Sequence, residues 1–76
     1  MKVSSETTLR EFGEMLEKLE VSHVLGAIYD GQVMIRLVVD RQDYVGVASM
    51  GSGIACAVHE AVRKVEQAKG VDTNAL

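Results

Sequence analysis

Proline and tryptophan are absent from this chain of 76 residues, and it contains one cysteine. The single cysteine, Cys56, cannot form a disulfide within the chain, so we expect no disulfide framework and a reducing, cytoplasmic location. Phe, Trp and Tyr make up only 4% of the residues, although 47% of the residues are hydrophobic. The core must therefore be built from aliphatic side chains, and their excess in so small a chain indicates a buried interface.

Positive charge is also scarce: eight Lys and Arg residues stand against eleven Asp and Glu residues, and the formal net charge is −3. A broad surface for nucleic acid or for an anionic membrane needs a basic excess, so neither partner is expected. No apolar run approaches the length of a membrane span, and residues 1–12 lack the apolar core of a signal peptide. We expect a single domain over residues 1–76, with an ordered core at about 5–70 and a flexible tail at 71–76.

Near the N-terminus, apolar residues recur at helical spacings of three and four: Leu9, Phe12, Leu16 and Leu19. Ser5 is one candidate N-cap, and Thr8 followed by Glu11 fits a capping box. We therefore predict a helix that starts between Ser5 and Thr8 and runs to about Glu20. Because glycine is unfavourable inside a helix, Gly13 is expected to mark a close backbone contact.

Two extended runs flank Asp30-Gly31, which is the strongest short signal for a hairpin with a type I′ turn. This turn sets Tyr29 opposite Gln32. One face of the hairpin is then apolar and predicted to be core: Val24, Ile28, Val33, Ile35, Leu37 and Val39. The other face is mixed: His23, Leu25, Ala27, Tyr29, Gln32, Met34, Arg36 and Val38.

After a turn at residues 41–43, we predict a third strand at 44–49 and a helix from about 53 to 69 that is closed by Gly70. This helix has a wide apolar stripe: Ile54, Ala57, Val58, Ala61, Val62, Val65 and Ala68. Glu60 and Lys64 are spaced for an ion pair on its opposite side. The predicted fold is α+β, in the order α-β-β-β-α: a three-stranded antiparallel meander with two helices packed on one face.

The second face of the sheet is then left open, with an apolar patch around Arg36 that consists of Leu25, Tyr29, Met34 and Val38. Monomers seldom expose such a patch, and Tyr, Met and Arg are enriched in interface cores. We therefore predict a non-catalytic domain that forms a homodimer through this face, or by pairing of a strand edge. The alternative is that the patch forms a wall of a groove for a small molecule or peptide.

Gly51, Ser52 and Gly53 precede the second helix, and the amides of a helix N-terminus favour anions. They are the candidate residues for a site that binds a small ligand or anion. However, no phosphate-binding motif is present and no Lys or Arg is near in sequence. A tight strand-to-helix turn, with Ser52 as the helix cap, is the favoured interpretation.

His23, His59 and Cys56 are too few and too scattered for metal-ligand spacing, so we expect no metal, and we expect no cofactor. Cys56 lies among small apolar residues and is predicted to be buried and inert. His59 is expected to be solvated, and His23 to contribute to an interface. No enzyme signature is found, and the aspartates are explained by turns.

The α-β-β-β-α order, with a Gly-x-Gly turn before an alanine-rich last helix, resembles the double-stranded-RNA-binding domain. That family's lysine cluster is replaced by "SGIACAVHEAV", so the resemblance implies the shape and not RNA binding. The stretch "QVMIRLVVDRQDYVGVASMGSGIACAVHEAVRKV" is similar to the regulatory (dimerisation) domain of the alpha-isopropylmalate synthase family, although Ile54 replaces the family's proline. Those domains associate in pairs and bind an amino-acid effector near their interface. The resemblance therefore implies self-association or small-ligand sensing.

Overall fold

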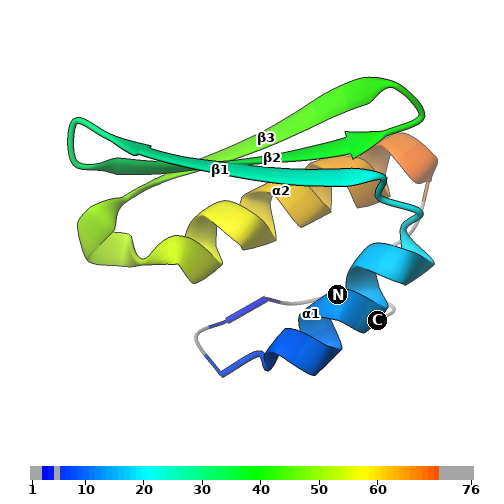
Figure 1. Cartoon of the computed structure of the whole chain (residues 1–76), viewed down its shortest axis with the longest axis horizontal. Coiled ribbons are helices and arrows are strands. Elements are labelled where there is room, and N and C mark those ends of the chain that lie inside the picture. Colours follow the sequence, from blue (N-terminus) through cyan, green and yellow to red (C-terminus); the bar gives the residue numbers. More distant parts are fainter. Residues whose placement is uncertain (1–2, 5, 71–76) are drawn as a thin grey trace.

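A computed structural model confirms the predicted α+β class and the order α-β-β-β-α, and it describes residues 3–4 and 6–70. The candidate cap Ser5 and the predicted tail at 71–76 lie outside the described residues. The elements are α1 (Leu9–Lys18), β1 (His23–Tyr29), β2 (Gln32–Val39), β3 (Gln42–Ser49), a short 3-10 turn η1 (Met50–Ser52) and α2 (Ile54–Lys69). The antiparallel strands are neighbours in the order β1-β2-β3, and both helices lie on the same side of the sheet (Figure 1).

The hairpin of β1 and β2 is the one that the sequence predicts. Asp30 and Gly31 have φ angles of 47° and 72°, the positive values that a type I′ turn requires at both central positions. Tyr29 lies opposite Gln32, and the predicted register holds along the whole of β1. Because side chains alternate along a strand, this register decides which residues share a face.

The turn between β2 and β3 differs from the prediction. It consists of Asp40 and Arg41, whose φ angles are 51° and 66°, and β3 begins at Gln42 rather than Tyr44. The prediction of a turn at 41–43 is wrong. Non-glycine residues seldom adopt a positive φ, so a two-residue turn of Asp40 and Arg41 was not expected from the sequence. The longer β3 pairs with β2 along its full length.

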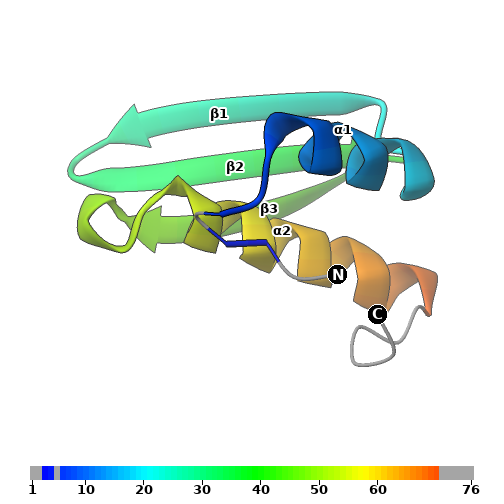
Figure 2. The same ribbon diagram turned by 90° about the horizontal axis from the view of Figure 1, so that it is seen from below.

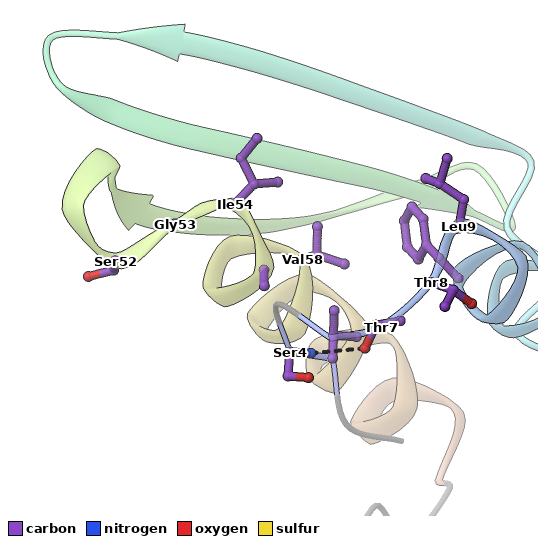
Figure 3. A pocket seen from close by; sticks show the side chains of 11 residues that line it. Ser4, Thr7, Thr8, Leu9, Ser52, Gly53, Ile54 and Val58 are labelled. Atoms are coloured by element: carbon purple, nitrogen blue, oxygen red, sulfur yellow. Dashed lines mark hydrogen bonds between the residues drawn. The ribbon is translucent and has the colours of Figure 1, made fainter.

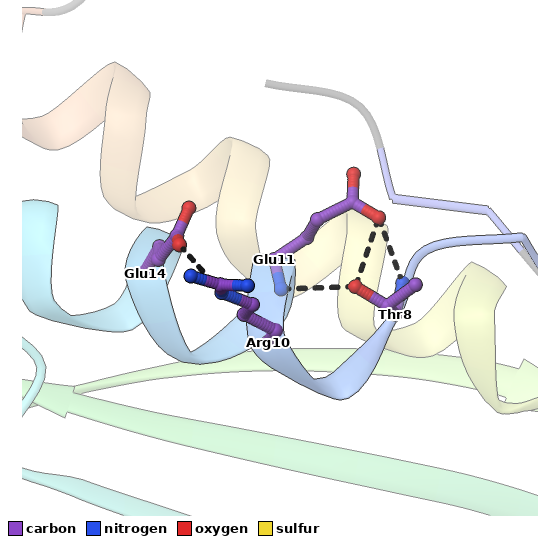
Figure 4. Close-up of polar contacts among 4 residues, drawn as sticks. All are labelled: Thr8, Arg10, Glu11 and Glu14. Atoms are coloured by element: carbon purple, nitrogen blue, oxygen red, sulfur yellow. Dashed lines mark hydrogen bonds and ion pairs between the residues drawn. The ribbon is translucent and has the colours of Figure 1, made fainter.

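Helix α1 begins at the predicted capping box of Thr8 and Glu11 (Figure 4). The Thr8 hydroxyl accepts a hydrogen bond from the Glu11 N–H at 3.1 Å, and the Glu11 carboxylate accepts one from the Thr8 N–H at 3.1 Å. The bond from the Thr8 backbone, followed by one from its hydroxyl, holds the pKa of Glu11 below its ordinary value of 4.5. The helix ends at Lys18, before the predicted Glu20, because Glu20 is left-handed with a φ of 59°.

The core lies between the helices and the strands β2 and β3. The four predicted core residues of β2 are buried together with residues of α1, its C-cap and α2. The buried core consists of Met15, Leu19, Val33, Ile35, Leu37, Val39, Ala57, Val58, Ala61, Val62 and Val65. The Glu66 side chain of α2 is also buried. Gly70 closes α2 as predicted, in the left-handed conformation with a φ of 76°.

Gly46 of β3 sets how closely α2 approaches the sheet. A Cβ atom at this position would lie 2.7 Å from the Ala61 backbone nitrogen and nearer still to the Ala57 carbonyl oxygen. The helix therefore packs directly on the strand backbone, which only glycine allows here. The close contact predicted at Gly13 is wrong, because nothing lies within 4 Å of a Cβ built there.

Two predicted core residues of β1 are exposed instead: Val24 by 45% and Ile28 by 64%. Helix α2 packs mainly on β3 and β2. Helix α1 lies toward the end of the sheet where β1 begins, and the Tyr29 end of β1 has no helix beneath it (Figure 2). The apolar alternation of β1 correctly indicates a strand, but the helices leave this strand largely uncovered.

Candidate interaction surface

The five predicted interface residues all lie on the face of the sheet away from the helices. Leu25 is opposite Arg36 in the β1–β2 ladder, and Met34 and Val38 extend the same face along β2. Leu25 and Tyr29 are 50% and 48% exposed, and the other three are half-buried. We call the face formed by Leu25, Tyr29, Met34, Arg36 and Val38 the sheet patch.

Strand β3 enlarges the sheet patch with two residues that were not predicted. Val45 lies opposite Arg36, and Val47 lies opposite Met34. Val47 is exposed and Val45 is half-buried. Their alternation with Tyr44, Gly46 and Ala48 indicates that they share one face of β3. Which face of the sheet this is follows only from the β2–β3 register.

The single charged side chain in the sheet patch, Arg36, has an opposite charge beside it. Its Nε lies 3.8 Å from an Asp43 carboxylate oxygen, and both side chains are partly exposed. An exposed pair of this kind contributes little to stability. Beside it, the patch is hollowed by about 180 Å³, and this hollow is lined by Leu25, Gly26, Ala27, Met34 and Arg36.

The segment Gly51-Ser52-Gly53 forms a compact turn that joins β3 to α2. The Ser49 hydroxyl accepts a hydrogen bond from the Ser52 N–H at 3.3 Å, and the Ser49 and Ser52 hydroxyl oxygens are 2.9 Å apart. Gly53, with a φ of 87°, is the N-cap of α2 and supplies no side-chain bond. The prediction that Ser52 caps α2 was therefore wrong, because Ser52 lies in η1.

A mostly apolar cleft of about 380 Å³ separates α1 from the start of α2 (Figure 3). Ser52 and Gly53 border it. Its lining comes from the N-terminal segment, α1 and the first turns of α2: Val3, Ser4, Thr7, Thr8, Leu9, Phe12, Ser52, Gly53, Ile54, Ala55 and Val58. Leu9 is 88% exposed, and Ile54, which was predicted to join the buried stripe, is exposed as well. Sequence reasoning missed this cleft because it depends on the distance between two helices that hardly touch.

Cys56 and His59 do not have the surroundings that the sequence predicts. Cys56 is exposed rather than buried, and its thiol donates a hydrogen bond to the Ser52 carbonyl at 3.2 Å. His59 is partly buried rather than solvated. Its Nδ1 accepts a hydrogen bond from the Val3 N–H at 3.2 Å. His23 is exposed, with Nδ1 3.1 Å from the Ser22 hydroxyl. Residues 3–4 and 6–70 contain no cluster of three side chains suited to a metal ion.

Comparisons with models of known families, with characterised proteins and with solved structures find no match for this chain. What the structure shares with the double-stranded-RNA-binding domain is therefore the small α-β-β-β-α shape. Over the described part of the chain, neither helix combines the length and the apolar character that crossing a membrane requires.

Proposed function

We propose that the protein is a small non-catalytic domain that forms a homodimer through the sheet patch. The observation that carries the proposal is the uncovered face itself. Neither helix lies on it, Leu25 and Tyr29 are half exposed, and the half-buried Met34 and Val38 continue the same face along β2. Removing apolar surface from water stabilises an association by roughly 25 cal/mol per Å² before the costs of ordering.

The chemistry of the sheet patch suits a second copy of the same chain. Its shallow hollow accepts a side chain, and Leu25 and Tyr29 are the exposed side chains that a facing copy would present. Burying Arg36 unpaired would be costly, but Asp43 already lies beside it. A two-fold arrangement uses the same residues from both copies, as isologous dimers do.

Replacing Met34 or Val38 with Asp tests the homodimer. We expect each variant to remain folded and to become monomeric, because a carboxylate in the centre of the interface cannot be buried without a partner. Sedimentation equilibrium measures the mass, and circular dichroism measures the fold. Gln67→Asp adds the same charge on the exposed side of α2 and should leave the dimer intact. A wild-type protein that is monomeric at high concentration would refute the proposal.

The cleft between α1 and α2 supports a second candidate function, the binding of a small ligand. Its walls are apolar, its volume falls in the range of small-molecule sites, and Ser52 and Gly53 lie at its border. A ligand with an aliphatic body and a carboxylate matches both features, because the N-terminus of α2 favours negative charge.

Medium-chain aliphatic carboxylates should raise the melting temperature, whereas alcohols of equal chain length should do so much less. The melting temperature follows binding because a ligand of the folded state shifts the unfolding equilibrium. Ile54→Glu should abolish the rise by placing a charge in the cleft. Ala68→Glu, at an exposed position near the other end of α2, is the control. An equal rise with carboxylates and alcohols would remove the role of the α2 N-terminus.

The two family resemblances bear unequally on these proposals. Similarity to the regulatory domain of the alpha-isopropylmalate synthase family supports both self-association and ligand binding. Similarity to the double-stranded-RNA-binding domain makes RNA binding a third candidate, which the net charge of −3 disfavours. Lys64 does not serve a phosphate site in this arrangement, since its ammonium donates to the Val45 carbonyl at 2.7 Å.

A further inference from the structure

The two outer strands of the sheet differ in how their free edges are protected. At the β3 edge, the Lys64 ammonium binds the Val45 carbonyl at 2.7 Å and lies 3.4 Å from the Glu60 carboxylate. A lysine over a strand edge is a common device against pairing with another chain. Strand β1 has no such protection: it contains no Lys, Arg, Asp, Glu or Pro, and all its residues are exposed except the half-buried Ala27.

The register identifies which backbone groups of β1 face outward. In a two-residue hairpin the flanking residues, Tyr29 and Gln32, form a hydrogen-bonded pair, and such pairs alternate along the ladder. Val24, Gly26 and Ile28 therefore direct their N–H and C=O groups away from β2. The same alternation along β3 directs the Val45 carbonyl outward, which is the group that Lys64 binds.

We propose that β1 pairs antiparallel with β1 of a second copy of this chain, with a two-fold axis beside Gly26. Gly26 is the middle residue of the seven in β1, so this register pairs the strand along its full length. Val24 then lies opposite Ile28 of the second copy, and each of these residues uses outward-facing groups. The two three-stranded sheets become one sheet of six strands, and the unprotected edge disappears.

The side chains of β1 are complementary to themselves in this register. On the helix side, the exposed Val24 and Ile28 of one copy meet Ile28 and Val24 of the other, so that four apolar side chains leave water together. On the opposite face, His23 lies across from Tyr29 of the second copy and next to its Asp30. No like charges face each other, and the histidine meets a phenol and a carboxylate.

The placement of α1 favours the same arrangement. Helix α1 lies toward the end of the sheet where β1 begins, and the end of β1 at Tyr29 has no helix beneath it (Figure 2). Antiparallel pairing brings the uncovered end of one β1 next to the covered end of the other. Because the axis is perpendicular to the sheet, both sheet patches remain on one side and stay available, so this contact goes beyond the proposed dimerisation through the patch.

Cysteine cross-linking in a Cys56→Ser background tests the register, since Cys56 is exposed and would react itself. Val24→Cys mixed with Ile28→Cys should give about tenfold more disulfide dimer than either variant alone, because only the mixed pair falls within the roughly 7 Å limit between Cα atoms. Each residue is about 14 Å from its own copy across the axis, four residues along the strand. Gly26→Cys should cross-link with itself. Dimers are measured on non-reducing gels and by intact mass.

Gly26→Pro, added to the mixed pair, should abolish the cross-link. The Gly26 N–H faces away from β2 and would bind the second copy, and proline has no N–H. Circular dichroism checks the fold. Gly26→Ala keeps the outward N–H, and its added Cβ would lie 3.5 Å from the Ile35 Cδ1, an ordinary contact, so this variant should retain most of the cross-link. A mixture that yields no more dimer than the single variants would overturn the proposal.

Adding Met34→Asp to the mixed pair separates this proposal from the proposed function. The cross-link should persist when the sheet patch is disabled, and loss in that variant alone would assign dimerisation to the patch instead.

Discussion

Gly46 and Gly13 both lie inside regular elements, yet their surroundings are opposite. Gly46 has the backbone of α2 against it, with the Ala61 nitrogen 2.7 Å from where a Cβ would be, whereas Gly13 has open space. The first glycine is required by packing, and the second only loosens α1. The two sites therefore predict opposite effects of the same substitution.

Gly46→Ala should destabilise the protein by about 2 kcal/mol or more, because α2 must move away from β3 to admit the methyl group. Gly13→Ala should stabilise it by about 0.5–1 kcal/mol, because alanine restricts the unfolded chain and favours the helix. Denaturant unfolding with a common slope measures both. Equal effects of the two substitutions would show that α2 does not rest on the backbone of β3.

The burial of residues in α2 was predicted from the sequence only in part. The stripe from Ala57 to Val65 is buried as predicted, but Ile54 and Cys56 are exposed and Glu66 is buried. Periodicity gives the angular spacing of apolar residues and not the rotation of the helix about its axis. That rotation depends on the contact at Gly46, which is known only when α2 and β3 are placed together.

At the scale of single elements, the capping box of α1 can be predicted from local sequence, whereas the turn between β2 and β3 cannot. Thr8 and Glu11 satisfy each other within one turn of α1, so the sequence offered this capping box beside the other candidate start at Ser5, and the structure has Thr8 as the N-cap. The Asp40-Arg41 turn resembles Asp30-Gly31 in geometry but has no glycine. It joins β2 to β3 where Val39 lies opposite Gln42, and the local sequence did not indicate it because neither residue is a glycine.

Thr8→Ala should destabilise α1 by about 1 kcal/mol at neutral pH, because the N-cap hydroxyl is lost. It should also raise the pKa of Glu11 toward its ordinary value of 4.5, although only in part, since the Thr8 N–H still reaches the carboxylate. Because the pKa of Glu11 is lower in the folded protein, the stabilisation from the bonds to its carboxylate is present above about pH 4.5. It is lost as the pH falls through the pKa of Glu11 in the folded protein. Carboxyl NMR titration measures the pKa. Thr8→Ser should behave like the wild type, and an unchanged pKa in Thr8→Ala would contradict the role of the hydroxyl.

At the scale of the whole molecule, the fold class and strand order were predictable, whereas the coverage of the sheet was not. Two helices were expected to bury the whole apolar face, but α2 lies over β2 and β3 and leaves Val24 and Ile28 of β1 in solvent. The five predicted residues share one face because the β1–β2 register places them there, whereas Val45 and Val47 of β3 were not predicted. The cleft and the unprotected edge of β1 depend on where the helices lie in space, which alternation of residue types cannot encode.

The two-residue turns have a consequence for how fast this protein folds. Each strand is adjacent in the sheet to the strand next to it in sequence, so neither hairpin requires the closure of a long loop. Topologies dominated by such short-range contacts fold quickly. The slow step is then expected to be the seating of α2 on β3 at Gly46, where a helix must find one position along a bare strand backbone before the core can close.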